Sequence, residues 1–265
     1  MIISKDCLYV SLVGKELEHS FFEKKLSYNA ELAFFALKDV VAGNVDGTAA
    51  KVKKVLEENK VKFSIHGPFM ELMYDSRDLD VVKLAEQKVM NGLKVAEFLG
   101  AEHIVFHSTY NPLSQVANSK FDMFWVKKSA EFWKKIIDSC KDFSGMILIE
   151  NIFDDSPEPI KKLIAEVNNP MFKVCLDVGH ANIYGKKYLI DEWVEGFGED
   201  LKHLHVHDNH GGEDEHLGVG AGNIDFEAFF NALDNLNECP PFVLEVRGED
   251  ELERSLKYLR DNNLL

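Results

Sequence analysis

Short apolar runs alternate along this chain with longer segments in which apolar residues recur every three or four positions. Eight of the runs have the length of a strand, and most are rich in Val, Ile, Leu and Phe. They are Cys7–Val13, Glu31–Leu37, Val61–His66, His103–His107, Met146–Glu150, Phe172–Asp177, Leu201–His207 and Phe242–Val246. Runs of this length and composition predict buried β-strands.

Segments with helical periodicity lie between these runs. They are Asp78–Leu99, Asp122–Asp142, Pro157–Val167, Leu189–Phe197, Phe226–Leu236 and Leu252–Leu259. Their apolar residues recur at the spacing of one helix face. Gly100 directly follows the first of them, where a helix C-cap is expected.

The order of these elements predicts an α/β fold. Strands that alternate with helices pair in parallel through right-handed crossovers. An open doubly wound sheet is one alternative, but no G-x-G-x-x-G motif follows the first strand. Eight strands favour a closed (β/α)8 TIM barrel. The chain has 265 residues and no Gly-, Ser- or Pro-rich linker, so residues 1–265 are expected to form a single domain.

The composition narrows the choice of partners. The formal net charge is −15, which disfavours a nucleic-acid partner because such proteins usually present a basic face. None of the four cysteines forms a CxxC pair, and no segment predicts a signal peptide or a membrane span. We therefore expect a cytoplasmic protein with a small-molecule partner, and a homo-oligomer stays open.

The most informative feature is how the strands end. Six of the eight runs end in residues that can bind a metal ion, namely His66, His107, Glu150, Asp177, His205 with His207, and Glu245. In a barrel, the C-terminal strand ends converge on one mouth. Side chains alternate along a strand, so the apolar residue before each of these should face the helices, and the polar residue should face the lumen.

Such a cluster favours a divalent metal ion. Without a cation the carboxylates would repel one another and their pKa values would rise. Imidazole and carboxylate groups suit Zn, Mn, Co or Mg. Two more motifs extend the cluster: His180 stands three residues after Asp177, and Asp214-Glu-His216 stands in the loop after the seventh strand.

Structural interpretations compete with this one. A single strand-end residue such as His66 or Glu150 is more often a hydrogen-bonded or salt-bridged structural group, but six matching strand ends favour a metal site. His103 and His203 begin their strands, near the barrel bottom, where structural roles are expected. His207 stays open between a metal ligand, a residue that orients a ligand, and a substrate contact.

Several motifs together resemble the xylose isomerase-like barrel superfamily, and in particular its sugar phosphate isomerase/epimerase branch. They are Cys-Leu-Asp177-Val-Gly-His180-Ala, His205-Val-His207-Asp208-Asn, Asp214-Glu-His216-Leu-Gly, Gly220-Ala-Gly-Asn-Ile-Asp225-Phe and Leu-Glu245-Val-Arg247. The resemblance extends from the second or third strand to the end of the chain.

The resemblance implies ligands for one to three ions. Endonuclease IV, in the same superfamily, uses three zinc ions, and its pattern would assign His66, His107 and Glu150 to the first. The second would be bound by Glu150, Asp177, His205 and Glu245, with Glu150 bridging, and the third by His180, Asp214 and His216. Sugar epimerases of the superfamily use a single metal ion and the four central ligands only.

The chain departs from endonuclease IV at several positions. Gly179-His180 replaces a Cys-His pair, and Asn209-His210-Gly211 stands where that enzyme has Ser-Lys or Ala-Lys after a His-x-Asn-Asp motif. The loop Lys38–Asn44 lacks the Arg and aromatic residues that a DNA-bending enzyme needs. Together with the net charge, these departures disfavour cleavage at abasic sites.

The first functional hypothesis is therefore a metal-dependent isomerase or epimerase of a sugar or sugar phosphate. Glu150 and Glu245 would exchange protons with the substrate through an enediolate. Its substrate contacts would be Arg247, His180, His207 and Tyr110. The second hypothesis is a two- or three-metal phosphoester hydrolase that resembles endonuclease IV, and the third is a barrel without catalysis that binds a metabolite or a protein.

Overall fold

The computed structural model describes residues 2–12, 28–33, 46–114, 120–185 and 187–265. Within these residues eight parallel strands close into one barrel in the order of the sequence. The strands are β1 (Leu8–Leu12), β2 (Asn29–Leu32), β3 (Phe63–His66), β4 (His103–His107), β5 (Met146–Glu150), β6 (Phe172–Asp177), β7 (Leu201–Val206) and β8 (Phe242–Leu244). The predicted TIM barrel is confirmed.

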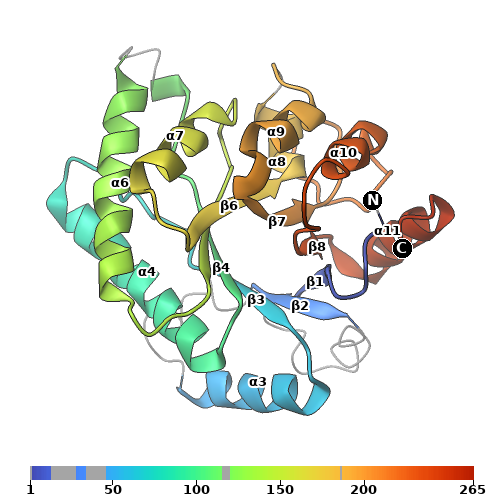
Figure 1. Ribbon diagram of the computed structural model, residues 1–265, viewed down its shortest axis with the longest axis horizontal. Helices are drawn as coiled ribbons and strands as arrows, with labels where there is room; N and C mark the ends of the chain where they lie inside the picture. The colour runs from blue at the N-terminus through green and yellow to red at the C-terminus, as the bar shows by residue number, and fades with distance from the viewer. Residues whose placement is uncertain (1, 13–27, 34–45, 115–119, 186) are drawn as a thin grey trace.

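Helices lie outside the ring of strands (Figure 1). In chain order they are α3 (Asp46–Asn59), α4 (Leu79–Leu99), α6 (Phe121–Ser139), α7 (Glu158–Val167), α8 (Val178–Tyr184), α9 (Ile190–Phe197), the short 3-10 helix η3 (Gly198–Asp200), α10 (Phe226–Leu233) and α11 (Gly248–Asp261). Gly100 caps α4 in the left-handed conformation, with φ 83°, as predicted. Among the described residues, no helix is both long enough and apolar enough to span a membrane.

Three elements differ from the sequence-based expectations. The second strand begins at Asn29, two residues before the predicted start at Glu31, and residues 34–37 of the predicted run lie outside the described residues, as do Val13 and the loop Lys38–Asn44. Helices α3 and α8 were not predicted. The buried side chains of α3, Ala49, Val52 and Leu56, do follow helical spacing, but charged residues surround them and weaken the apolar pattern.

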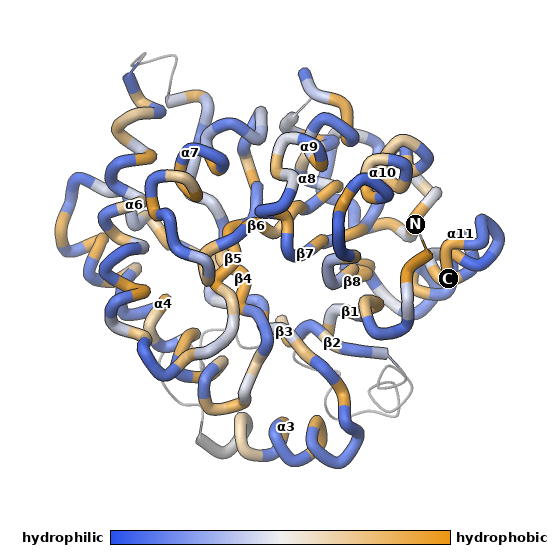
Figure 2. The backbone as a smooth tube through the Cα atoms, in the orientation of Figure 1, coloured by the Kyte–Doolittle hydropathy of each residue, from blue (hydrophilic) through white to orange (hydrophobic). Residues whose placement is uncertain are grey.

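The predicted alternation along the strands is confirmed. Ile65, Phe106, Ile149, Leu176 and Leu244 all belong to the large apolar core that includes the inner faces of the helices. Hydrophobic positions concentrate along the strands, as β4 and β5 show in Figure 2.

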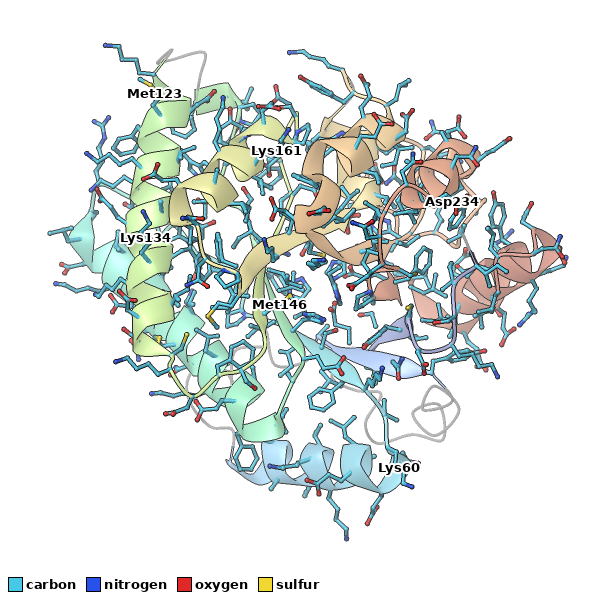
Figure 3. The ribbon with its side chains drawn as sticks, viewed as in Figure 1. Lys60, Met123, Lys134, Met146, Lys161 and Asp234 are labelled. Atoms are coloured by element: carbon cyan, nitrogen blue, oxygen red, sulfur yellow. The ribbon has the colours of Figure 1, made fainter. Side chains whose placement is uncertain are left out.

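The inside of the barrel is packed by a second, smaller apolar cluster. It consists of Val105, Leu148 and Cys175, each two residues before a polar strand end on the same face. Met146 packs against this cluster and lies near the centre of the barrel, whereas Lys134 and Asp234 project from the periphery (Figure 3). The apolar layer forms a floor, and the polar strand ends form the layer above it.

Candidate metal centre

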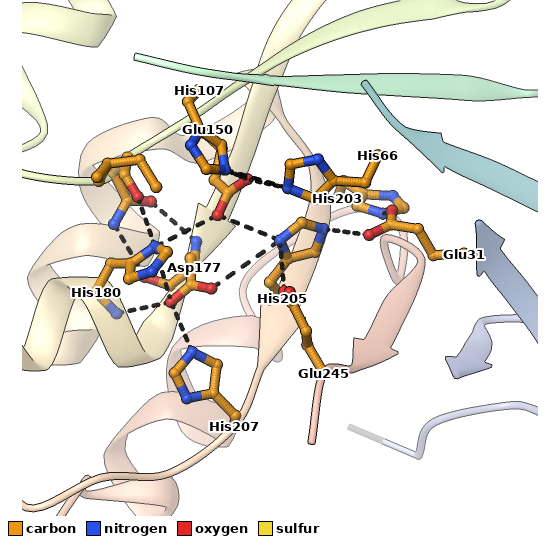
Figure 4. Close-up of polar contacts among 12 residues, drawn as sticks. Glu31, His66, His107, Glu150, Asp177, His180, His203, His205, His207 and Glu245 are labelled. Carbon is orange, nitrogen blue, oxygen red and sulfur yellow. Dashed lines mark hydrogen bonds and ion pairs between the residues drawn. The ribbon is translucent and has the colours of Figure 1, made fainter. Parts of the chain in front are cut away.

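The predicted strand-end residues meet at the mouth of the barrel. His107 on β4 lies opposite Glu150 on β5, and Asp177 on β6 lies opposite His205 on β7 in the strand register. Figure 4 shows their side chains pointing toward one another, with His66 from β3 and Glu245 from just beyond β8. Most of this cluster is buried, but the side chains of His107 and Glu245 are 20% and 21% exposed, so the site opens at the mouth.

His66, His107 and Glu150 form the first group of ligand atoms. The two Nε2 atoms are 3.1 Å apart, and each lies 3.4 Å from Oε2 of Glu150. A tetrahedral zinc ion with ligands at about 2.0–2.1 Å requires ligand atoms roughly 3.3 Å apart, so this spacing suits one ion. Nδ1 of His66 lies 3.0 Å from the carbonyl oxygen of Gly67, which leaves Nε2 available as a ligand if Nδ1 carries the proton.

The same two imidazoles differ in their affinity for a proton. Burial opposes the charged form of both, but the contact with Glu150 outweighs it at His66 and raises the pKa of that imidazole to about 9. Burial lowers the pKa of His107 to about 3, although Glu150 opposes this effect. In the metal-free protein the pair therefore carries one positive charge at neutral pH, on His66.

Glu150 connects the first group to a second one. Its other oxygen, Oε1, lies 3.3 Å from Nδ1 of His205, and that nitrogen is 3.0 Å from Oε2 of Glu245 and 4.0 Å from Oδ2 of Asp177. A carboxylate with one oxygen in each group is placed to bridge two ions, as the resemblance to endonuclease IV implies for Glu150.

The hydrogen bonding of these atoms supports a metal site. Oε2 of Glu150, Oδ2 of Asp177 and Nδ1 of His205 are buried and have no hydrogen-bond partner within the described part of the chain. A buried polar atom without a partner costs about 1–3 kcal/mol, so several in one place call for a ligand. Together these groups fit a divalent cation that prefers nitrogen and oxygen ligands, such as zinc, manganese or cobalt.

The carboxylates have the charge state that a metal ion needs. Burial alone would raise the pKa of Glu150, but the imidazoles of His205 and His107 hold it well below the ordinary value. His205 likewise lowers the pKa of Glu245 against the effect of burial. The pKa of Asp177 is also lowered, since His180 and His207 outweigh its burial.

A third group lies beside the second. Nε2 of His216 is 2.9 Å and Nε2 of His180 is 3.7 Å from Oδ2 of Asp214. The Nδ1 atoms of the two imidazoles lie close to backbone carbonyl oxygens, that of His180 at 3.1 Å from Asn151 and that of His216 at 2.7 Å from Glu245. Protons on Nδ1 would leave both Nε2 atoms free to bind an ion.

Glu31 is a buried member of the site that the sequence analysis missed. Its Oε1 lies 2.8 Å from Nε2 of His205, and its Oε2 lies 2.8 Å from Nε2 of His203 and accepts a hydrogen bond of 2.9 Å from Ser64. The contact with His205 favours a proton on Nε2, so that Nδ1 faces the metal cluster. The alternation of side chains along β2 could have revealed this residue. Ala30 and Leu32 belong to the apolar core outside the barrel, so Glu31 between them faces the lumen.

The four predicted substrate contacts have different surroundings. Arg247 is exposed at the mouth, where its guanidinium donates a hydrogen bond of 3.1 Å to the carbonyl oxygen of Asp214. His180 belongs to the third group of ligand atoms, and His207 is fully buried beside it. Tyr110 is also fully buried; its hydroxyl donates to Asp122 and its ring packs against Trp125, so we do not propose it as a substrate contact.

A cavity of about 350 Å³ opens beside His107. Its lining includes Phe69, Asn111 and Phe153 from the loops after β3, β4 and β5, and the ring of Phe69 stacks on His107 at 5.1 Å. An apolar, aromatic lining with a few polar groups beside a charged cluster is typical of a small-molecule site.

Comparisons with known proteins agree with this architecture. A family model described as Xylose isomerase-like TIM barrel matches residues 29–262. An uncharacterized protein of Methanocaldococcus jannaschii, MJ1311, is 26% identical over 247 residues, which are 88% of this chain and 81% of that protein. A probable endonuclease 4 of Aquifex aeolicus is 23% identical over 278 residues, covering 96% of this chain and 95% of the relative.

Among solved structures, a D-tagatose 3-epimerase-like protein superposes with a TM-score of 0.77 and 22% identity, covering 96% of both chains. At this level of identity the similarity shows a shared fold.

Proposed function

Since this chain belongs to the xylose isomerase-like TIM barrel family, we propose that it is a metal-dependent isomerase or epimerase of a sugar or sugar phosphate. One observation carries the proposal. Two carboxylates from different strand ends, those of Glu150 and Glu245, lie 3.3 Å and 3.0 Å from the same nitrogen of His205 at the open end of the barrel.

This arrangement suggests separate roles for the metal ion and the two carboxylates. When bound, the metal ion supplies a Lewis acid that polarises a carbonyl and the neighbouring hydroxyl of the substrate. One of the two carboxylates, in its ionised form, would accept the proton from the carbon beside that carbonyl, which gives an enediolate. The other, after taking up a proton from solvent, would donate that proton to the opposite face of the enediolate. Glu245, with a partly exposed side chain, is the carboxylate nearer to solvent.

The substrate would extend from this centre into the cavity beside His107. Phe69 and Phe153 would contact its carbon faces, and Asn111 would offer hydrogen bonds. On the other side, Arg247 would anchor a hydroxyl or a phosphate group, because its planar guanidinium can donate several hydrogen bonds at once. His180 would contact the substrate from the third group of ligands.

A specific observation also supports a second candidate, a three-metal phosphoester hydrolase. His180, Asp214 and His216 form a group that a one-metal epimerase does not need. The relative from Aquifex aeolicus is named a probable endonuclease 4. The net charge of −15 works against a polyanionic substrate, so this candidate ranks second.

Solvent isotope exchange distinguishes the two functions. The protein, loaded with Mn²⁺, Co²⁺ or Zn²⁺, is incubated in D2O with a panel of ketoses and ketose phosphates, and deuterium at carbon is followed by NMR. Proton transfer predicts exchange and a new stereoisomer, both abolished in Glu150→Gln and unchanged in the control Glu195→Gln on the exposed face of α9. Exchange that survives in Glu150→Gln would contradict the assigned role. Cleavage of an abasic-site oligonucleotide without any exchange would favour the hydrolase.

A further inference from the structure

His207 lies next to the third group of ligands and is fully buried. Its ring stacks on that of His216, with centroids 4.1 Å apart and 21° between the planes. Its Nε2 is 3.3 Å from Oδ1 of Asp177 and 3.7 Å from Oδ1 of Asp214. Neither ring nitrogen has a hydrogen-bond partner in the described residues, and Oδ1 of Asp214 has none either. A buried imidazole that points unpaired at an unpaired carboxylate oxygen calls for a shared ligand.

Gly179 makes room for this imidazole. A Cβ at position 179 would lie 2.6 Å from Nδ1 of His207, and closer still to Nε2 and Cε1. The backbone of Gly179 does not have a positive φ, so its conformation does not require glycine. The space taken by the ring of His207 therefore explains this glycine.

We propose that His207 is a fourth protein ligand of the third metal ion, together with His180, Asp214 and His216. Three imidazole nitrogens and one carboxylate oxygen form a complete set for tetrahedral zinc, and sites with four protein ligands are structural, whereas catalytic sites keep a position open. The third ion would then hold the loop that carries Asp214 and His216 against α8, and would bind no water for hydrolysis. The inference rests on the metal-binding part of the proposed function and does not depend on the substrate.

A plain hydrogen bond from His207 to Asp177 is the competing role. The 3.3 Å contact between Nε2 and Oδ1 lacks hydrogen-bond geometry, and the same oxygen already accepts a bond of 2.6 Å from the backbone N–H of His180. Removal of a residue that only orients a ligand weakens metal binding roughly 10–100-fold, whereas removal of a ligand should exceed that range.

Metal binding by His207 variants tests the proposal without any assay of activity. Purified His207→Ala and His207→Asn are titrated with Zn²⁺ against a chromophoric chelator, and bound zinc is counted by elemental analysis. The weakest-bound ion should lose affinity by more than about 100-fold, while the other ions stay bound. With Co²⁺, the visible spectrum of one ion should change from four-coordinate toward higher coordination as water replaces the imidazole. The control His210→Ala, on the same loop but exposed and paired with Glu215, should match the wild type.

Gly179→Ala provides a second test in which every proposed ligand is retained. The added methyl group would push the ring of His207 away, so the affinity for the third ion should fall again. Circular dichroism of the metal-free variants establishes that they fold. An unchanged third ion and an unchanged Co²⁺ spectrum in both His207→Ala and Gly179→Ala would overturn the proposal, with the proposed function intact. A wild-type protein that binds no ion would overturn the metal-dependent function as well.

Discussion

Two clusters of carboxylates and imidazoles lie one above the other inside this barrel, and His205 belongs to both. In the lower cluster, Glu31 contacts His203 and His205 at 2.8 Å and Ser64 at 2.9 Å. In the upper cluster, the oxygens of Glu150 lie 3.3–3.4 Å from imidazole nitrogens, among them that of His205. The residue types are the same, but the separations differ by about half an ångström.

This difference separates an ion-pair network from a set of metal ligands. The contact of Glu31 with His203 is a hydrogen bond, whereas the distances from Glu150 to its imidazole neighbours are close to the roughly 3.3 Å between two ligands of tetrahedral zinc. Glu31 is also sealed from solvent, with 0% exposure, whereas the upper cluster opens at the mouth through His107 and Glu245. Access from solvent and the position of Glu150 between two groups, rather than residue identity, therefore favour the upper cluster as the metal site, and we propose that the lower cluster orients His205.

Glu150→Gln should have the largest effect. The amide is a much weaker ligand than a carboxylate, so any ion that Glu150 contacts should be lost or weakened well beyond the roughly 10–100-fold expected for an indirect partner. Bound metal counted after dialysis should fall by one ion if only the central group is filled, or by two if the His66–His107 group is filled as well, and deuterium exchange into any substrate should disappear. A full complement of metal in Glu150→Gln would show that the upper cluster is no ligand set.

Removal of metal from the wild-type protein should have the next largest effect. An ion present at about 1,000 times its Kd stabilises the folded state by about 4 kcal/mol, which for a chain of this size is a shift in Tm of roughly 10 °C. Thermal unfolding with and without a chelator measures the shift, and added Zn²⁺ or Mn²⁺ should reverse it. Because Glu31 lies outside the proposed ligand set, Glu31→Gln should keep a chelator-sensitive Tm. If the Tm of the wild type did not change on addition of the chelator, the upper cluster would not contain a stabilising metal ion.

Glu31→Gln should have a smaller effect of a different kind. Loss of the charge beside Nε2 of His205 should weaken the central ion roughly 10–100-fold, which is about 1.4–2.7 kcal/mol, without changing the number of ions at saturation. Ser64→Ala, which removes one hydrogen bond to the same carboxylate, is the milder matched variant. If saturated Glu31→Gln held one ion fewer than the wild type, the lower cluster would itself be a metal site.

The sequence predicts the upper cluster far better than the lower one, and the reason is geometric. His66, His107, Glu150 and Asp177 are each the last residue of a strand, and alternation beside an apolar neighbour is a local property that fixes their direction. Glu31 and His203 are separated by 172 residues and meet because the closed barrel brings β2 and β7 to face one another across its interior. No local sequence pattern predicts the contact between Glu31 and His203.

The sequence also did not predict how deeply Tyr110 and His207 are buried. Tyr110 follows β4 closely enough to suggest the mouth, but Trp125 and Asp122 of α6 hold it inside the core. The burial of His207 depends on the missing side chain of Gly179 on another element. Such contacts between elements, rather than strand ends, decide which polar residue reaches the substrate.

A third buried carboxyl sharpens the comparison, and its predicted effect is on stability alone. Asp154, in the loop after β5, is fully buried and bonds to the hydroxyl of Ser108 and the backbone N–H of Ile152. Burial raises its pKa to about 7, with those hydrogen bonds opposing the shift. It has no imidazole among these partners, and so it gains a proton where the carboxylates of the two clusters stay ionised.

The consequence is a pH-dependent cost that Asp154→Asn should remove. With a pKa near 4 in the unfolded chain and about 7 in the folded one, the acid favours folding fully below pH 4 and progressively less as the pH rises through 7. Three pKa units correspond to at most about 4 kcal/mol, and altered hydrogen bonding to Ser108 lowers the stability of the variant equally at both pH values. The stability change caused by Asp154→Asn should therefore be more favourable at pH 8 than at pH 4, by up to about 4 kcal/mol. Urea unfolding of the chelated protein at both pH values measures it, with Asp155→Asn, a partly exposed neighbour paired with Lys187, as the control. Equal gains at both pH values would mean that packing, and not the charge on a lone buried carboxyl, distinguishes Asp154 from the two clusters.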